Sequence, residues 1–162
     1  MRTIKFRGKK VTNGVWAYGS LVYLDENGAA IYVQTGNGSA MVMDLVYVAP
    51  DTVCQFTGFT DKNGKEIYEG DVLRSDEYPY SCIGDKKRDN YYAVVYYCEE
   101  GACFGTVTAK NPSSDVGGIS DGILDDVERE KMQDFEVIGN VYDPEWKQYR
   151  EYIQDEDEEQ HQ

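Results

Sequence analysis

The sequence predicts an all-β protein made of small barrels, with one short helix close to its C-terminus. Short runs rich in aromatic and β-branched residues recur at roughly ten-residue spacing, as in small barrels and sandwiches. Turn signals of the Asn-Gly kind, which suit tight hairpins, lie between these runs. No apolar run approaches the roughly 18 residues of a membrane-spanning helix. The 162 residues make one ordinary domain or two very small ones.

The first half of the chain contains three predicted strands. Residues 14–24, GVWAYGSLVYL, alternate in part and are rich in strand-forming residues. Asp25-Glu-Asn-Gly28 is a turn, after which residues 29–34 return as the second strand. A loop over residues 35–40 leads to a third strand, 41–48, which Pro50 ends. We therefore expect an N-terminal β subdomain over residues 1–50.

The second half has more strands and longer loops. A hairpin turn at Asp61-Lys-Asn-Gly64 separates the strands 52–59 and 66–68, and the chain stays extended over 72–74. Residues 91–98, YYAVVYYC, and 103–109 form another hairpin, and 135–142 form the last strand. Residues 75–90 and 111–122 are polar and irregular. Residues 123–132 suggest a short helix with Asp121 as its N-cap.

The C-terminal end has the pattern of a helix. Asp143-Pro-Glu145 supplies a capping acid, a proline at the first helical position and a negative charge in the first turn. An apolar stripe follows at helical spacing and should dock the helix on the barrel; it consists of Trp146, Tyr149 and Ile153. We expect a C-terminal subdomain over residues 51–153 and a disordered acidic tail over 154–162.

Charge restricts the class of partner. The formal net charge is −14, and residues 151–162 contain six acids and no Lys or Arg. Such a chain repels phosphate-rich partners at long range, which disfavours direct nucleic-acid binding. A basic protein partner is compatible with the charge. A nucleic-acid module remains open only if Lys86, Lys87 and Arg88 mark a local basic face, since small barrels often bind single strands through aromatic side chains.

Compartment and metal chemistry follow from the cysteines and the single histidine. The N-terminus MRTIKFRGKK is basic but precedes no apolar signal region, so we expect a cytoplasmic protein with no membrane partner. Its four cysteines should then be reduced thiols that pack as small apolar residues. There is no Cys-x-x-Cys pair, and the only histidine is His161. We expect no metal site and no cofactor.

A Ser or Cys nucleophile in this chain would lack a histidine base to activate it. With no histidine outside the tail, Ser-His-Asp and Cys-His arrangements are excluded. The stretch KNGKEIYEGDVL, residues 62–73, holds three acids, Glu66, Glu69 and Asp71. Glu69 and Asp71 are two apart on an extended segment and would share a face, as an acid–base pair could. We favour a bend, in which Gly70 provides backbone freedom and Asp71 bonds nearby amides. We therefore predict no catalytic residues.

Three other features have a structural and a functional interpretation. Gly36-Asn-Gly38 lacks the third glycine, the lysine and the following helix of a phosphate loop. Cys98 and Cys103 flank a four-residue turn, but no basic group is evident to activate a thiol, so we expect packing residues. The 14 tyrosines include two adjacent pairs, which in a strand place rings on both faces. Outward rings suit an interface, although strand preference alone also accounts for them.

The chain resembles the YopX family of phage and prophage proteins in three segments. The opening Met1-Arg-Thr-Ile-Lys-Phe-Arg7 is similar to the family's usual start. Residues 55–73, QFTGFTDKNGKEIYEGDVL, resemble its central block, which is long and specific. Phe135-Glu-Val-Ile-Gly-Asn-Val-Tyr142 resembles its closing block. Gly8-Lys-Lys10 departs from the family's continuation, and the loops 75–90 and 111–122 have no counterpart.

The resemblance implies an all-β protein with a small SH3-like barrel in its C-terminal part, here within residues 51–153. It implies no catalytic residue and no cofactor. We expect a phage or prophage accessory protein that acts in the host cytoplasm by protein contact or by self-assembly, with a homo-oligomer as one form of the latter. Two alternatives stay open: an acidic decoy of a host nucleic-acid-binding protein, and a carboxylate-based enzyme using Glu69 and Asp71.

Overall fold

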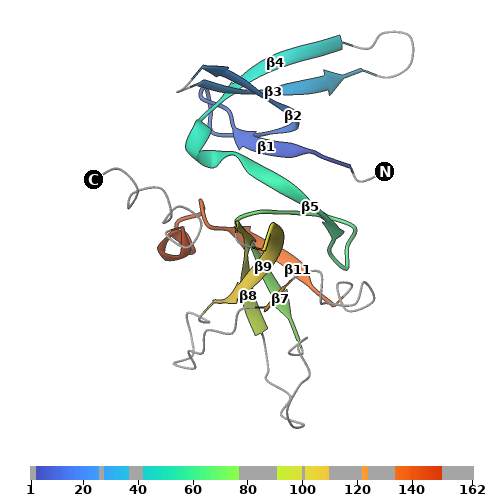
Figure 1. Cartoon of the computed structure of the whole chain (residues 1–162), viewed down its shortest axis with the longest axis vertical. Helices are drawn as coiled ribbons and strands as arrows, with labels where there is room; N and C mark the ends of the chain where they lie inside the picture. Colours follow the sequence, from blue (N-terminus) through green and yellow to red (C-terminus); the bar gives the residue numbers. More distant parts are fainter. Residues whose placement is uncertain are drawn as a thin grey trace. The chain divides into compact units, whose positions relative to one another are not determined.

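Two antiparallel sheets make up the described part of the chain, which confirms the all-β class (Figure 1). The computed structural model describes residues 3–25, 28–36, 42–76, 91–99, 101–109, 122–123 and 134–150. Contacts divide the chain into two compact units, Met1–Gly58 and Phe59–Gln162. This division falls within the strand over residues 54–60, later in the chain than the boundary at residue 50 expected from the sequence.

The first sheet has the strand order β4-β3-β2-β1-β5-β6. Its strands are β1 (Phe6–Lys9), β2 (Trp16–Asp25), β3 (Gly28–Thr35), β4 (Val42–Val48), β5 (Cys54–Thr60) and β6 (Glu66–Tyr68). A 3₁₀ turn, η1 (Pro50–Thr52), connects β4 to β5. Hairpin pairing of β2 with β3, and of β3 with β4, follows the turn signals of the sequence.

Strand β1 is the element of this sheet that the sequence patterns did not predict. It is short, and Arg7 and Lys9 give it a polar appearance. Nevertheless it lies between β2 and β5, and Arg7 is buried. The guanidinium carbon of Arg7 lies 4.4 Å from the centre of the Trp16 ring, and Lys9 Nζ lies 5.3 Å from it. Cation–π contact with the same ring thus accommodates both basic side chains in the middle of a sheet.

One side of the first sheet forms the hydrophobic core of the first unit. Ala17, Ala29, Ile31 and Val48 are buried together there, with Leu21 and Val46 packed against them. The register pairs Leu21 with Ile31 and Ile31 with Val46, so these side chains share one face. Because side chains alternate along a strand, the intervening residues of β3 and β4 lie on the other face.

The second sheet has the order β10-β9-β8-β7-β11. Its strands are β7 (Asp71–Ser75), β8 (Tyr91–Cys98), β9 (Cys103–Thr108), β10 (Gly122–Ile123) and β11 (Glu136–Asn140). Ala93 and Val95 of β8 belong to one buried cluster, whereas Val94 belongs to another. Alternate residues of β8 therefore enter cores on both faces of the sheet. This double burial explains why the strand is almost continuously apolar.

The prediction of closed barrels is not confirmed. In the described residues the first sheet ends in β4 and β6 and the second in β10 and β11, and the SH3-like barrel implied by the family resemblance is likewise not confirmed. Hairpin signals specify which neighbouring strands pair, but they do not specify whether the outermost strands meet. On the side of β4 away from β3, the described residues form a single isolated β-bridge, between Lys10 and Val48.

The C-terminal helix is also not confirmed. In place of an α-helix beginning at Pro144, the described chain forms turns and the 3₁₀ segment η3 (Lys147–Tyr149), and Ile153 lies outside the described residues. Trp146 and Tyr149 are nevertheless buried in the second unit, as the apolar stripe predicted. Asp143 does not cap a helix; its carboxylate accepts a hydrogen bond from the Asn140 backbone N–H at 2.9 Å. That bond turns the chain back immediately after β11.

The predicted helix over residues 123–132 cannot begin as expected. Ile123 lies in β10, where it pairs with Gly105 of β9. The rest of that prediction, with Asp121, lies outside the described residues, as does the acidic tail 154–162.

We predict that Gly139→Ala destabilises the second unit through Trp146. A methyl group at Gly139 would lie 2.8 Å from Trp146 Nε1 and 2.9 Å from its Cδ1, so the indole would have to move. Overpacking of this kind costs about 1–3 kcal/mol, measurable by urea unfolding. In a Trp146→Leu background the same change should cost clearly less, because the ring is gone. Additive costs in this double-mutant cycle would refute the packing explanation.

Candidate functional site

The Asp61–Gly64 hairpin turn is held by the Asp61 carboxylate. Asp61 Oδ1 accepts hydrogen bonds from the backbone N–H groups of Asn63 at 2.8 Å and Lys65 at 2.9 Å. The backbone closes the same turn, since Gly64 N–H donates to the Asp61 carbonyl at 2.9 Å. Gly64 has φ +78°, which glycine adopts readily. The predicted turn is thus confirmed, with Asp61 as its organising residue.

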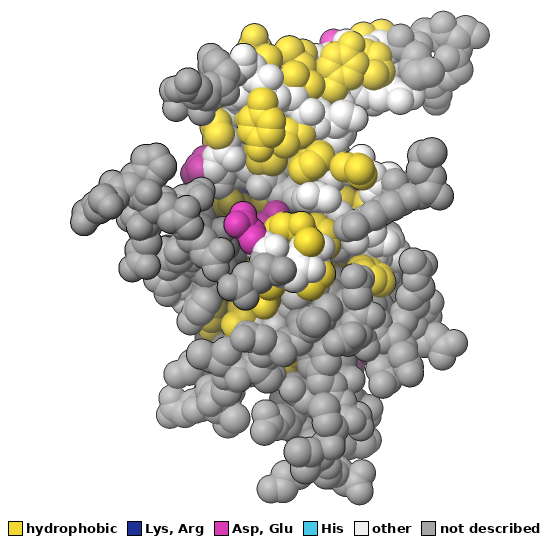
Figure 2. All heavy atoms as spheres, viewed as in Figure 1, with side chains coloured by type: hydrophobic (Ala, Val, Ile, Leu, Met, Phe, Trp, Pro, Cys, Tyr) yellow, Lys and Arg dark blue, Asp and Glu magenta, His cyan; other side chains and the backbone are white. Residues whose placement is uncertain are grey.

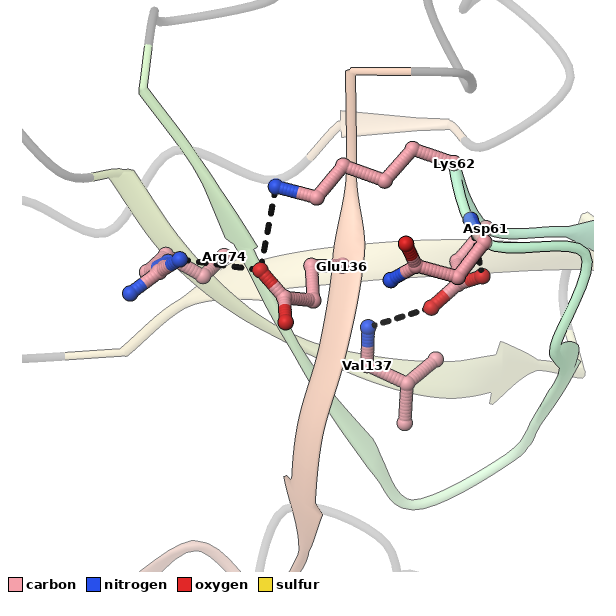
Figure 3. A network of polar contacts seen from close by, with 6 residues as sticks. Asp61, Lys62, Arg74, Glu136 and Val137 are labelled. Carbon is pink, nitrogen blue, oxygen red and sulfur yellow. Dashed lines mark hydrogen bonds and ion pairs between the residues drawn. The ribbon is translucent and has the colours of Figure 1, made fainter.

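The other carboxylate oxygen of Asp61 joins this turn to β11, far away in the sequence. Asp61 Oδ2 accepts the Val137 backbone N–H at 3.0 Å (Figure 3). The Lys62 backbone N–H donates to the Phe135 carbonyl at 2.8 Å. Asp61 is buried, and burial alone raises its pKa. The three backbone N–H donors together outweigh burial and hold the pKa of Asp61 below its ordinary value.

A surface ion-pair group lies next to this anchor. Glu136 Oε2 lies 3.0 Å from Lys62 Nζ and 2.8 Å from Arg74 Nη2 (Figure 3). The hydrogen bond from Lys62 is the main reason why the pKa of Glu136 is lowered. All three side chains are about one-third exposed, so solvent screens the group. It connects the turn, β7 and β11.

The Glu69-Gly70-Asp71 segment is a bend between β6 and β7. Asp71 Oδ2 accepts the Tyr68 backbone N–H at 2.8 Å, and Gly70 takes φ +76°. Gly70 is fixed on both sides, because its N–H donates to the Val95 carbonyl and its own carbonyl accepts the Val141 N–H. A glycine with a positive φ is what such a bend requires. The favoured interpretation of this segment is therefore supported.

Asp71 also connects the bend to the end of β11. Its Oδ1 accepts the side-chain amide of Asn140 at 3.3 Å, and Asn140 Oδ1 in turn accepts the Tyr142 backbone N–H at 3.0 Å. Asp71 is 1% exposed, whereas Glu66 bonds the Tyr68 hydroxyl at 2.7 Å. The three acids of residues 62–73 are thus not presented together at the surface, and the buried Asp71 is occupied by backbone and amide donors.

The sequence predicts Asp61 only as the first residue of a hairpin turn, and its candidate acids are Glu66, Glu69 and Asp71. The available signal was the Asp-x-x-Gly turn pattern, because an Asp at the first position of a turn commonly accepts the following amides. What the pattern could not reveal is the bond from Asp61 to Val137, because these residues are distant in the sequence.

The remaining predicted residues are scattered. Cys98 and Cys103 are register partners across β8 and β9, as their spacing suggested, and Cys54 is buried in the first unit. Gly36 directly follows β3 and has φ +94°, and the rest of its loop lies outside the described residues. Also outside them lie Cys82, Lys86, Lys87, Arg88 and His161.

Two common functional features are absent from the described residues, a cluster of metal ligands and a membrane-spanning helix. No group of three or more His, Cys, Asp or Glu side chains there is placed to hold a metal ion. Within the same residues, no helix has the length and apolar character needed to span a bilayer.

Exposed hydrophobic side chains concentrate in the first unit. Eleven of the twelve large hydrophobic side chains that are exposed among the described residues belong to it, and Tyr97 is the exception. In Figure 2 hydrophobic side chains gather over the part of the surface that carries the first sheet. Five of them lie on the sheet face opposite the core, by register and alternation. This β2–β4 face comprises Tyr18, Tyr32, Met43, Leu45 and Tyr47.

The β2–β4 face is apolar over neighbouring strands. Tyr32 and Leu45 are direct cross-strand partners, as are Gln34 and Met43. The five side chains are 38% to 58% exposed, although residues of these types usually lie inside. Contiguous exposed apolar surface marks interaction sites more often than single exposed residues do. This face is the strongest candidate site in the described residues.

Comparisons with known proteins support the family resemblance. A family profile described as "YopX protein" matches residues 5–145, most of the chain. A search of functionally curated proteins finds no match. Among solved structures, the crystal structure of protein EF1440 from Enterococcus faecalis is similar, with 17% sequence identity and a TM-score of 0.49. That similarity covers 87% of this chain and 94% of the other.

We predict that Asp61→Asn lowers the free energy of unfolding by about 2 kcal/mol at pH 7, because one carboxamide oxygen cannot accept all three backbone donors. A lowered pKa in the folded state stabilises the fold above the ordinary Asp value of 3.8, and this contribution is lost as the pH falls below it. In urea unfolding, the difference in the free energy of unfolding between wild type and Asp61→Asn should therefore narrow below pH 4.

The exposed Asp134 provides the matched control. Asp134→Asn should change the unfolding free energy by less than about 0.5 kcal/mol at pH 7. If Asp61→Asn and Asp134→Asn behaved alike, or if the Asp61→Asn gap stayed constant down to pH 2.5, the carboxylate would not be the anchor.

Proposed function

The chain belongs to the YopX protein family, and from this premise we propose that it is a phage or prophage accessory protein that acts by protein–protein contact or self-assembly in the host cytoplasm, without catalysis. The single observation that carries the proposal is the exposed β2–β4 face. The phage setting draws on the family resemblance.

The two units differ in how much hydrophobic surface their described residues expose. In the second unit, alternate residues of β8 are buried on both faces of the sheet, and among its described residues Tyr97 is the one large hydrophobic side chain that is exposed. The first unit buries one face of its sheet and exposes the other, although that face carries three tyrosines, a leucine and a methionine. Tyrosine and methionine are enriched at protein interfaces, where rigid rings and adaptable thioethers supply contact area.

Charge also favours the first unit as the place of contact. Residues 1–58 contain five Lys and Arg against four Asp and Glu, a formal net charge of +1. Residues 59–162 contain eleven against twenty-six, a net charge of −15. A nearly neutral apolar face can be desolvated at much lower cost than a strongly charged one.

The absence of catalysis is supported by the acids of residues 62–73. Asp71, one half of the only acid–base pair that the sequence offered, accepts hydrogen bonds from Tyr68 and Asn140 deep in the fold. Those donors hold its carboxylate in place as part of the bend. A role in shaping the turn accounts for these contacts without a substrate.

We predict that the double variant Tyr32→Ser, Tyr47→Ser abolishes the contact and leaves the fold intact. Both rings are substantially exposed, so the unfolding free energy should change by about 1 kcal/mol or less. The matched control is Tyr97→Ser, which removes from the second unit a ring that is about as exposed as Tyr32. Native mass measurement and affinity capture from host cells, with and without phage, should lose an oligomer or a specific partner only in the double variant.

A chain that is monomeric at high concentration, and whose captured proteins are the same for wild type, the double variant and Tyr97→Ser, would refute the proposal.

The charge distribution favours a second candidate, an acidic decoy of a host nucleic-acid-binding protein. The net charge of −15 on residues 59–162 could mimic a phosphate backbone. Binding would then engage a basic protein and weaken steeply between 50 mM and 500 mM salt, because screening removes long-range attraction. Contact through the β2–β4 face should persist over that range. Capture at both salt concentrations therefore separates the two candidates.

A further inference from the structure

Among the described residues, nothing pairs with the outer edge of β4 along most of its length. In the described residues, β4 pairs with β3 on one side, and on its other side it is bonded only at its C-terminal end. There Val11 N–H donates to the Tyr47 carbonyl and Ala49 N–H donates to the Lys9 carbonyl. Exposed edge strands are templates for an additional strand, and most proteins protect them with charges, prolines or bulges.

These end contacts reveal which backbone groups of β4 face outward. The Tyr47 carbonyl points away from β3, and the groups of successive residues in an antiparallel strand alternate in direction. The register between β3 and β4 runs from Val42 to Val48 without a bulge, so the alternation holds throughout. The N–H and C=O groups of Met43 and Leu45 therefore point away from β3, toward the open edge.

Asp44 sits between these two outward residues and carries the only charge of β4. It is exposed and pairs across the sheet with Val33. Among the described residues, the one side chain that bonds its carboxylate is Thr35, whose hydroxyl lies 3.5 Å from Oδ2. The charge is thus available to a residue placed beside β4.

This charge selects between two occupants of the edge. If two copies of β4 paired antiparallel through Met43 and Leu45, each Asp44 would face the other Asp44 at about 4.5 Å between Cα atoms. Like charges directly opposite one another destabilise strand pairing, whereas opposite charges stabilise it. In this register the edge disfavours a second copy, and it complements a strand with a basic residue opposite Asp44.

We propose that β4 binds, as an added antiparallel strand, an extended segment of a partner protein in which a Lys or Arg stands between two apolar residues. The basic residue faces Asp44. The two apolar residues form backbone hydrogen bonds with Met43 and Leu45 and extend the apolar β2–β4 face. This inference rests on the proposed function, because it names the chemistry of the partner that the same surface takes.

The test uses the full ¹⁵N-labelled chain and two capped peptides, Thr-Thr-Val-Lys-Val-Thr-Thr and its twin with Glu in place of Lys. We expect the Lys peptide to shift the amide signals of Met43 and Leu45 and to bind about fivefold more tightly than the Glu peptide. In Asp44→Asn the two affinities should agree within about twofold. Asp134→Asn should leave the fivefold preference unchanged.

A variant of the chain tests the backbone part of the proposal. Leu45→Pro removes an N–H that faces away from β3, so it spares the sheet and blocks strand addition. It should abolish binding of the Lys peptide while the amide signals of β2 and β3 persist. An N-methylated valine peptide provides the same test with the chain unchanged, and it should also fail to bind.

Three results would overturn the inference: equal binding of the Lys and Glu peptides, unmoved Met43 and Leu45 signals at millimolar Lys peptide, or concentration-dependent self-pairing through these two residues at neutral pH. In each case the proposed function is judged separately. It survives if Tyr32→Ser, Tyr47→Ser still loses the contact that Tyr97→Ser retains, and it falls if all three chains behave alike.

Discussion

The Asp61 carboxylate, which accepts hydrogen bonds from the backbone N–H groups of Asn63, Lys65 and Val137, is the interaction on which the second unit depends. It shapes a hairpin turn and at the same time fixes that turn to β11, so local and distant structure share one charged acceptor. Asp71 repeats this arrangement at the next bend, where it bonds Tyr68 and reaches Asn140 at the end of β11. Ionised carboxylates that accept backbone N–H groups form strong bonds. The block of sequence that best identifies the family is therefore a structural device.

The two units then have different relations to solvent. In the second unit, β8 packs into core on both faces of the sheet. The Asp61 and Asp71 carboxylates accept hydrogen bonds within the fold, and other acidic side chains are exposed. The first unit keeps its sheet one-sided and nearly neutral, with tyrosines outside and an open edge at β4. Apolar surface on a water-exposed sheet is stabilised when a partner covers it. This difference is why a binding role is assigned to the first unit.

The sequence predicts strands and hairpins well because their signals are local. Runs of aromatic and β-branched residues located β2 and β8, and Asn-Gly pairs located turns such as Asn63-Gly64. It fails where distant residues decide. Strand β1 is recognisable only once Trp16 is known to pack against Arg7. Residues 141–146 form turns, with Trp146 packed on Gly139 and Asp143 bonded to Asn140. The exposed tyrosines were noticed as a composition, but which rings lie outside required the register.

Amide hydrogen exchange of the free chain reports in a single measurement on the carboxylate bonds of Asp61 and Asp71 and on the outward-facing amides of β4. We expect the Val137 and Tyr68 amides, which donate to Asp61 and Asp71, to exchange as slowly as the amides in the core of β8. We expect the Met43 and Leu45 amides, facing the open edge, to exchange orders of magnitude faster. Rapid exchange at Val137 and Tyr68, or strong protection at Met43 and Leu45 in the free chain, would contradict this account.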